Sequence, residues 1–338
     1  MTKPAFTLSA VTILLALAAL GSLLLGRYPV SLTDVGHFAS WSFHGCPPGN
    51  GQDMDMLRNI LLDIRLPRII GAVLVGAALS VSGTAYQSMF INPLVSPGLL
   101  GVLAGASFGA AFSMIFFHSL LSVKICAFGF GCAAVGLSML LARMYNGDRL
   151  LMLILGGIVS GAFFTALLSV VKYLADPYNQ LPAIVFWLMG GLSSVSMDTL
   201  ASLWVPVLLS LIVLTALSPY MNALSMGDEE ARTMGVPVGL VRTTIIVCAT
   251  LMSALTVVLA GIIGWVGLVV PHLTRMLTGP DNRILIPASA LTGALYLLAM
   301  DDLSRMLFTV EIPLGILTAL CGIPFFVLVL KNARKGWS

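Results

Sequence analysis

Residues 65–109 read RLPRIIGAVLVGAALSVSGTAYQSMFINPLVSPGLLGVLAGASFG. From Ile69 to Gly109 this stretch holds 41 residues without one Asp, Glu, Lys, Arg or His. A membrane helix needs only ~20 apolar residues to cross ~30 Å of hydrocarbon. The stretch therefore predicts two membrane crossings, joined by a kinked segment at residues 92–101. Non-helical backbone at membrane depth must be satisfied by protein or by a water-filled cavity, so a break of this kind indicates a transport pathway.

The composition of the whole chain predicts the same class. Its 338 residues are 58% hydrophobic and 9% charged, whereas soluble domains are roughly 25% charged. We expect an all-α polytopic membrane protein with about ten spans and no sizeable soluble domain. The formal net charge of +3 gives no indication of nucleic-acid binding. The five cysteines lack the paired spacing of a metal site or a disulfide framework.

Ten spans are expected, and their number determines the topology. They lie near residues 5–26, 67–88, 94–116, 123–142, 150–174, 198–219, 240–262, 263–277, 284–300 and 312–330. The first apolar run is too long for a signal peptide and is expected to stay as an uncleaved span. An even number of spans places both termini on one side. That side would carry ten of the 17 lysines and arginines, which modestly favours cytoplasmic termini.

The segment at residues 225–239, between the sixth and seventh expected spans, is predicted to form a short amphipathic helix. Its acidic first turn and its stop signals are Asp228, Glu229, Glu230, Gly235 and Pro237. Ala231 and Met234, three residues apart, would give it a small apolar face suited to the groove of a partner protein. On pattern alone, a solvated connector is the alternative.

Glycines recur at helical spacing in three rows. These rows are Gly101, Gly105 and Gly109; Gly157 and Gly161; and Gly261, Gly264 and Gly267. Small residues allow membrane helices to approach closely, so we interpret the rows as packing surfaces. The last row would also permit bending near Trp265.

Several motifs, in a consistent order from about residue 60 to 331, resemble one family. They are RLPR at 65–68, GAAL at 76–79 with Ser82, Gly83 and Gln87, NPLVSPGLLG at 92–101, GLVVPH at 267–272 with Arg275, residues 287–293 with Arg305, EIPLG at 311–315, TAL at 318–320 and GIP at 322–324. The chain is similar here to the permease subunits of iron-siderophore and cobalamin ABC importers, the type II importers.

That resemblance implies a BtuC-like fold and several partners. It implies a homodimer with a central pathway, two ATP-binding cassette subunits that hold ATP and magnesium, and a periplasmic or lipid-anchored binding protein. No cofactor or metal is implied for this chain itself. The location implied is the bacterial inner membrane.

Two sets of residues match functional positions of that family. The coupling helix to the ATPase would comprise Gly227, Asp228, Glu229, Glu230, Ala231, Arg232, Met234, Gly235 and Pro237. Arg65, Arg68 and Arg305 match positions that face acidic residues of the binding protein, with ordinary anchoring of span ends as the alternative. Exposed ion pairs of this kind steer and orient a transient dock.

The residues also bear on other classes of function. The chain lacks a GxxxxGK[ST] phosphate loop, so we expect a transport subunit without ATPase activity of its own. An ion-coupled secondary transporter is the main alternative, but such carriers usually show Asp, Glu or His inside their spans. His272 is the lone candidate near a helix interior, and we interpret it as a packed residue. An intramembrane enzyme would need a nucleophile with a base or a metal cluster, and neither pattern is present.

The cargo and its pathway are the least determined by the sequence. The family carries ferric siderophores, haem, cobalamin and, in some members, molybdate or tungstate; a ferric siderophore is the first expectation. Asn146, Gly147 and Asp148 would lie near the cytoplasmic gate. Ser160, Thr165 and Ser169 could face the pathway, although hydroxyls in membrane helices more often bond their own backbone.

Overall fold

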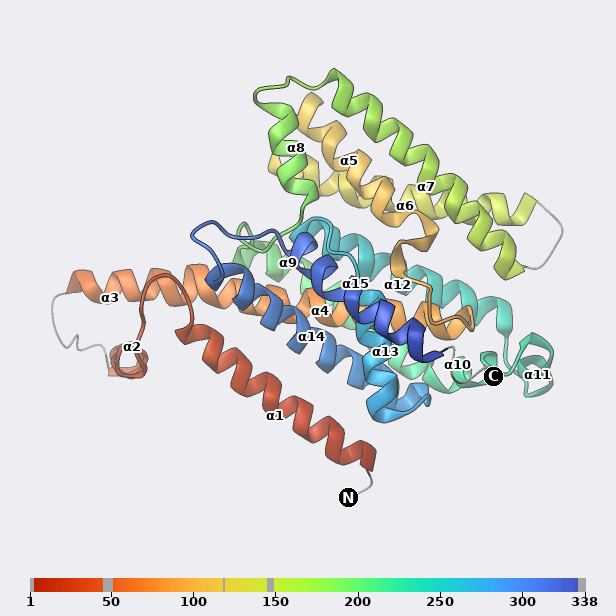
Figure 1. Cartoon of the computed structure of the whole chain (residues 1–338), viewed down its shortest axis with the longest axis horizontal. Coiled ribbons are helices and arrows are strands. Elements are labelled where there is room, and N and C mark those ends of the chain that lie inside the picture. Colours follow the sequence, from red (N-terminus) through yellow and green to blue (C-terminus); the bar gives the residue numbers. More distant parts are fainter. Residues whose placement is uncertain (1–2, 45–50, 118, 145–148, 334–338) are drawn as a thin grey trace.

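A computed structural model describes residues 3–44, 51–117, 119–144 and 149–333, and all regular structure in these ranges is helical (Figure 1). The elements are α1 (Lys3–Leu24), α2 (Leu32–His44), α3 (Gly51–Arg58), the π-helical η1 (Asn59–Arg65), α4 (Leu66–Met89), the 3-10 helix η2 (Pro97–Leu100), α5 (Val102–Phe116), α6 (Leu120–Met144), α7 (Arg149–Leu174), α8 (Gln180–Leu188), α9 (Met197–Ala216), α10 (Ser218–Leu224), α11 (Asp228–Thr233), α12 (Val238–Ala260), α13 (Val266–Thr278), α14 (Asn282–Met306) and α15 (Leu314–Ala333).

The membrane helices follow the expected order. Within the described residues, seven helices are long and apolar enough to cross a membrane, and Val102–Phe116 and Leu314–Leu328 are shorter apolar helices. Together with α13, a 13-residue helix packed inside the bundle, these helices correspond in order to the ten expected spans, whose crossing of the membrane stays a prediction. The prediction of an all-α polytopic membrane protein is confirmed.

Helix α4 is the centre of the bundle and packs against α12, α13 and α14. Its contacts depend on glycine. A Cβ added at Gly83 would lie within 3.0 Å of the Gly267 backbone, and one added at Gly76 would meet the Gly293 backbone in the same way. Since real Cβ contacts are essentially never this short, only glycine allows these helices to pack so closely.

The kinked joint at residues 92–101 begins three residues after α4 ends. Pro97 opens the 3-10 helix η2, and Gly101 turns the chain with φ +85° before α5 starts at Val102. The expected third span was therefore placed too early at its start: residues 94–101 form turns and one short helix, because the prolines and Gly101 cannot continue an α-helix here.

Helices α5, α6, α7 and α8 pack together as one lobe, drawn at the top of Figure 1. Its core holds an aromatic group made of Phe108, Phe112, Phe130 and Phe164, in which the Phe108 and Phe130 rings meet edge-on with centroids 4.9 Å apart. Gly105 and Gly109, from the first predicted glycine row, bring α5 against the α6 backbone at Phe130 and Cys126. This row is a packing surface, as predicted.

Three chain segments meet in what we term the main-chain junction, formed by residues 189–191, 260–262 and 313–315. The Gly191 N–H donates to the Ala260 carbonyl (2.8 Å), the Leu314 N–H to the Gly190 carbonyl (3.0 Å) and the Gly315 N–H to the Met189 carbonyl (3.0 Å). Gly190 and Gly261 have φ of +70° and +65°. The junction ties the end of α8, the end of α12 and the start of α15 to one another by backbone alone.

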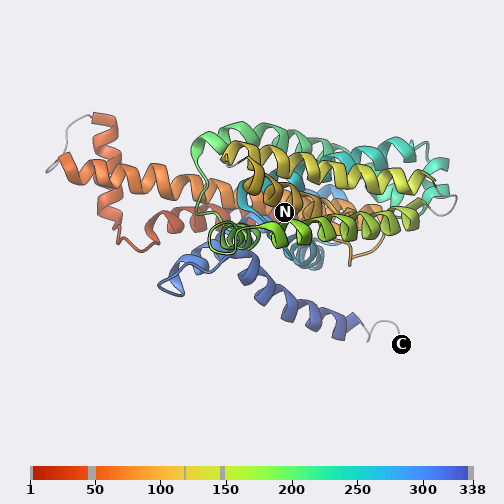
Figure 2. The ribbon, with the colours of Figure 1, turned by 90° about the horizontal axis from the view of Figure 1, so that it is seen from above.

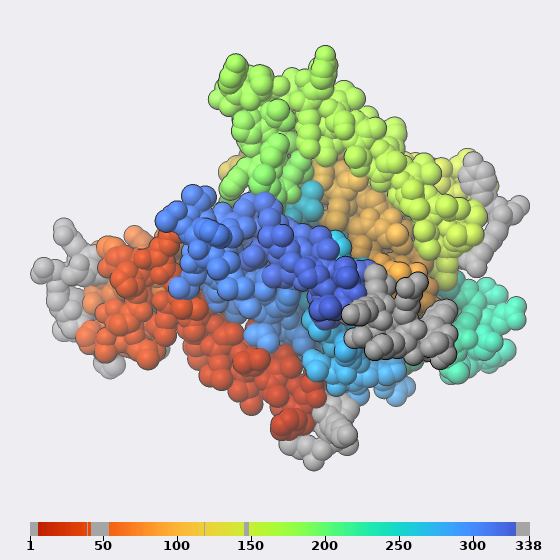
Figure 3. Space-filling model, viewed as in Figure 1, coloured from red at the N-terminus to blue at the C-terminus, as the bar shows by residue number. Residues whose placement is uncertain are grey.

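The outer elements are less enclosed. Figure 2 shows α2 and α3 projecting beyond the bundle, and α15 running away from it toward its C-terminal end. On the face drawn in Figure 3, α15 lies between α1 and α7. Its side chains Leu320, Val327 and Leu328 are exposed.

Candidate functional site

Helix α11 lies at one end of the bundle, which we call the α11 end (Figure 1). It is a short helix with a defined stop. The Val236 N–H donates to the Ala231 carbonyl (3.0 Å) and the Gly235 N–H to the Arg232 carbonyl (2.9 Å), with Gly235 at φ +79°. This pair of bonds is a Schellman motif, which requires a left-handed residue and favours glycine there. The predicted stop at Gly235 is confirmed.

An ion pair fastens α11 to α12. The Arg242 guanidinium donates through both terminal nitrogens to the Asp228 carboxylate, with Nη1 at 2.6 Å from Oδ2. The Arg242 side chain is 4% exposed and that of Asp228 is 33% exposed. A fork-to-fork pair of this kind fixes orientation as well as charge, so it holds α11 at a set angle on the bundle.

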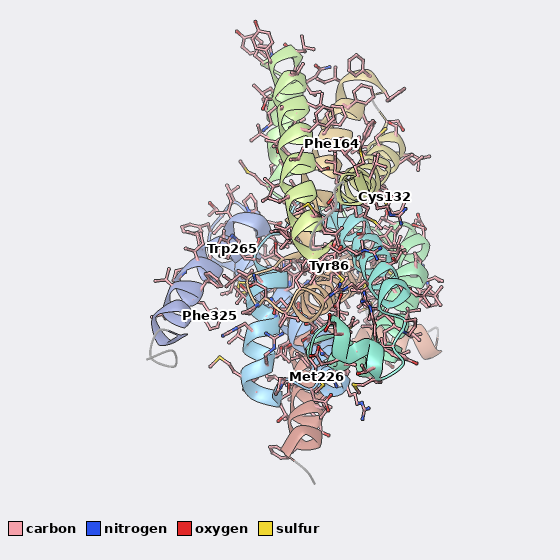
Figure 4. All side chains as sticks on the ribbon, turned by 90° about the vertical axis from the view of Figure 1, so that its right-hand side faces the viewer. Tyr86, Cys132, Phe164, Met226, Trp265 and Phe325 are labelled. Atoms are coloured by element: carbon pink, nitrogen blue, oxygen red, sulfur yellow. The ribbon has the colours of Figure 1, made fainter. Side chains whose placement is uncertain are left out.

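The exposed face of α11 differs in part from the predicted one. Glu229, Glu230 and Arg232 face solvent, and Met226 and Met234 expose 66% and 63% of their surface. In Figure 4, Met226 lies at the outer edge of the α11 end, whereas Tyr86 lies inside the bundle.

Ala231 was wrongly placed on that face. It is fully buried in the core cluster that also holds Val236 and Val238. The Ala231 methyl group packs against the core of this chain and is not available to a partner. The exposed apolar side chains next to α11 are instead Met226 and Met234. Gly227 and Pro237 flank the helix, and the carboxylate of Glu230 folds back over Gly227.

A polar network that sequence reasoning missed supports the same end. The Asn222 amide nitrogen donates to the Asp281 carboxylate (2.6 Å), and Asn222 Oδ1 accepts from the Asn282 backbone N–H (2.9 Å). Ser88 donates to Asn282 Oδ1 (2.6 Å). The bond from Asn222, followed by the Arg283 backbone N–H, lowers the pKa of Asp281. These contacts join α4, α10 and α14 beneath α11.

The opposite end, where α4 begins and α14 ends, holds a buried ionic cluster; we call it the Arg68 end. The Arg68 Nε donates to both oxygens of Asp301 (2.8 and 2.9 Å), and its Nη1 donates to Glu311 (3.0 Å). The Asp301 side chain is fully buried, whereas that of Glu311 is 35% exposed. Arg68 thus links α4, α14 and the loop before α15.

The other two predicted docking arginines lie beside it. Arg305 pairs with Asp301 (3.3 Å) and with Asp302, and it donates to the Ser22 hydroxyl (2.8 Å). Arg65 donates to the backbone carbonyls of Leu23 and Tyr28. Like Arg68, both side chains are largely buried in this chain. The structure brings the three arginines together with internal partners, and their role in docking stays a prediction.

The predicted pathway residues are divided by the structure. Ser160 is fully buried and donates to the Ala134 carbonyl (2.7 Å), which joins α7 to α6. Thr165 and Ser169 are exposed and bond their own helix, at the Gly161 carbonyl (2.8 Å) and the Thr165 carbonyl (3.0 Å). Asn146, Gly147 and Asp148 lie outside the described residues. Ser160 is thereby a packing residue, and Thr165 and Ser169 remain candidates for the pathway.

Two further observations concern side chains that could bind a metal ion or carry a proton. The His272 ring packs against Phe325, with centroids 6.4 Å apart, as expected of a packed residue; Figure 4 places Phe325 on the outlying helix α15. Among the residues that the structure describes, no group of three or more His, Cys, Asp or Glu side chains could hold a metal ion.

Among the described residues, seven helices long and apolar enough to cross a membrane, a broken segment between α4 and α5, and a short anchored helix at one end are the features of a polytopic membrane permease. The chain belongs to the FecCD transport family, whose model matches residues 13–332. The family resemblance stated from the motifs is therefore confirmed.

Individual relatives cover nearly the whole chain. The chain is 39% identical over 327 residues to the molybdate import system permease protein MolB of Haemophilus influenzae, covering 96% of this chain and 95% of the relative. It is 36% identical over 340 residues to the hemin transport system permease protein HmuU of Yersinia pestis, covering 98% and 97%. A solved structure described as an inward-facing metal-chelate type ABC transporter matches with a TM-score of 0.84 at 38% identity, covering 96% of this chain and 98% of that one.

Proposed function

We propose that this chain is the membrane subunit of an ATP-binding cassette importer, in which two copies form the pathway and two separate ATPase subunits drive it. The observation that carries the proposal is α11. Its backbone is fixed by the Schellman motif and its position by the Asp228–Arg242 pair, yet its outward side chains are free of the bundle. A rigid helix that exposes several charges and is flanked by two exposed methionines, Met226 and Met234, is suited to dock into a partner's groove.

The energy source follows from the same arrangement. The chain holds no phosphate-binding loop in its sequence, so ATP and magnesium would be bound by the partner that receives α11. Movement of that partner would reach α12 through the Asp228–Arg242 pair. It would reach α14 through the hydrogen bonds of Asn222 in α10. The chain itself would act as a transport subunit and not as an enzyme.

The cargo class is a metal-containing solute delivered by a binding protein. The relatives' own names give molybdate for one and hemin for another. A ferric siderophore was the first expectation from the sequence, and it falls within the same class. The ion-coupled carrier gains no support, because Asp301, the most buried carboxylate of the described spans, is engaged with Arg68 and Arg305.

Orientation and location follow from the docking proposal. The α11 end faces the ATPase and hence the cytoplasm of a bacterial inner membrane, which places both termini on the cytoplasmic side. The Arg68 end then faces the binding protein.

Purification of the tagged chain from its host, with quantitative mass spectrometry of the associated proteins, tests the assembly. An ATPase subunit at equal amount and a binding protein are the expected partners. Recovery of the chain by itself, under conditions that keep other ABC complexes intact, would instead favour the ion-coupled carrier.

A further inference from the structure

The break between α12 and α13 contains a tryptophan in a conformation that favours glycine. Trp265 has φ +68° and ψ −32°. Across it, the Val266 N–H donates to the Gly264 carbonyl at 2.8 Å, which closes a three-residue γ-turn. A γ-turn with a positive φ at its centre is rare and strained, above all for a bulky residue. Because strained backbone gathers at switch and binding sites, this turn points to a functional role.

The side chain of Trp265 packs on α15. A Cβ added at Gly322 would lie 2.9 Å from the Trp265 Cβ and 3.2 Å from its Cγ, so only glycine lets the α15 backbone come this close. The Phe326 ring, one turn further along α15, meets the indole edge-on with centroids 6.4 Å apart. Aromatic rings at this separation and angle attract each other. We term these two interactions the Trp265 contact.

Beyond its first turns, α15 is held to the bundle mainly at this point. In the described stretch 319–328, Gly322 is the one buried residue, and Val327 is 59% exposed. In Figure 4, Trp265 and Phe325 lie on the same side of the molecule, where α15 stands apart from the other helices. A segment with so little buried surface is able to move as a unit.

The strained turn also lies where a movement of α15 would be taken up. The main-chain junction ties the start of α15 to residues 260–262, and α13 begins at Val266. Residues 263–265 form the connection between the two. When α15 and the junction tilt together against α13, these residues must change conformation, and the indole then leaves Gly322.

We propose that Trp265 is the positioning residue that sets the tilt of α15 during the transport cycle. In the structure, the Trp265 contact offsets the backbone strain of the γ-turn. When α15 tilts away, the contact is lost and the strain is relieved, so the two arrangements differ little in free energy and a partner can switch them. The role in transport rests on the proposed function, whereas the contact and its release are independent of it.

The direct test uses the quenching of bimane fluorescence by a nearby indole. The full-length permease is purified with its ATPase in nanodiscs, and all cysteines except Cys321, which is exposed on α15 beside Gly322, are replaced by serine. Bimane on Cys321 should be quenched without nucleotide, and ATP with vanadate should raise its emission. Trp265→Phe keeps a ring against α15 but removes the quencher, so its emission should be high in both conditions.

A substitution on α15 gives a second test, which needs no ATPase. Gly322→Ala places a methyl group against Trp265 and should raise the bimane emission without nucleotide. The equilibrium between held and released α15 should shift by about two- to tenfold, as expected for one aromatic contact. Gly136→Ala in α6 is the matched control, because nothing lies within 4 Å of a Cβ added there.

A third test measures how the binding protein stimulates ATP hydrolysis. Trp265→Gly relieves the turn and removes the indole, so the stimulation should fall about two- to tenfold. Trp265→Phe should stay near wild type. Trp204→Ala, which removes a half-exposed tryptophan of α9, should have no effect.

Constant quenching with ATP and vanadate, or wild-type emission from Gly322→Ala, would overturn the proposal, as would normal stimulation in Trp265→Gly. Thermal unfolding identifies a variant that fails to fold, and the wild-type bimane measurement then decides. If ATPase stimulation is normal but emission stays constant, the importer assignment stands and this inference fails. If Gly322→Ala raises the emission but no ATPase co-purifies with the chain, the Trp265 contact stands and the proposed function fails.

Discussion

Arg242 and Asp228 form a two-pronged ion pair, in which the almost fully buried guanidinium of α12 holds the half-exposed carboxylate that opens α11. Among the described residues, it is the one ion pair that links α11 to the bundle. It sets the direction in which Met226, Met234 and the acidic side chains point.

Asp228→Ala should therefore separate ATP hydrolysis from transport. Loss of the Asp228 carboxylate leaves the Arg242 guanidinium buried without a counter-charge, which lowers the free energy of unfolding by about 1–3 kcal/mol or more. It also frees α11 from its fixed orientation on the bundle. We expect ATP-driven uptake in proteoliposomes to fall at least about tenfold while the ATPase still binds. Asp198→Ala, which removes an exposed carboxylate in the first turn of α9, should leave uptake unchanged. Normal uptake by the Asp228 variant would exclude this pair as the anchor.

Gly235 should accept asparagine and reject valine. Its φ of +79° lies in the left-handed region, which costs other residues roughly 1–2 kcal/mol and is tolerated best by asparagine. No atom lies within 4 Å of a Cβ added there, so backbone conformation is the main obstacle. Uptake by Gly235→Val should be strongly reduced, and uptake by Gly235→Asn should be near normal. If the two variants behave alike, the Schellman stop is unimportant for coupling.

The proposed docking face of α11 can be tested by reversal of its charge. Glu230→Arg should abolish uptake and leave membrane insertion and dimerisation intact, because Glu230 is exposed on that face. If the Glu230→Arg variant still co-purifies with the ATPase and shows full uptake, the ATPase does not dock on this face of α11.

Gly83→Ala should lower thermal stability sharply. The added methyl would overlap the Gly267 backbone, and overpacking of this kind costs about 1–3 kcal/mol or more. Gly129→Ala in α6 is the control, because nothing lies within 4 Å of a Cβ there and alanine favours a helix by roughly 0.5–1 kcal/mol. Thermal unfolding in detergent should thus move in opposite directions for the two variants. A Gly83 variant as stable as wild type would contradict the close contact of α4 with α13.

The ionic cluster at the Arg68 end should respond unequally to the loss of its carboxylates. Asp301→Ala removes the fully buried carboxylate that Arg68 and Arg305 share and leaves them their more exposed partners Glu311 and Asp302; breaking a buried pair costs about 3–5 kcal/mol. Glu311→Gln removes a partly exposed partner, worth up to about 1 kcal/mol. If Arg68 contacts the binding protein, Glu311→Gln should also strengthen docking and make it more sensitive to salt, since the guanidinium becomes more available. Surface plasmon resonance at two salt concentrations measures this effect; no change in affinity would argue for a purely structural role of Arg68.

The sequence predicted those features that local chemistry determines. The order of the spans follows from apolar run length, and the end of α11 follows from Gly235, whose φ only glycine adopts readily. Ala231 was misplaced because a spacing of three residues marks a helix face without saying whether that face meets a partner or the chain's own core.

Contacts between distant segments were not predictable in this way. Arg68 and Asp301 are 233 positions apart, and nothing in either local pattern specifies the other as partner. The same holds for the Asn222–Asp281 bond, whose partners are 59 positions apart. Only the folded bundle brings such groups together.

The main-chain junction has a mechanical consequence. Its three segments are joined by backbone hydrogen bonds between residues 189–191, 260–262 and 313–315, and Gly190, Gly261 and Gly315 bring backbone directly against backbone. Because these bonds run through the backbone, we expect a tilt of α15 to carry the end of α8 and the end of α12 with it, so that the three helix ends move as one rigid unit.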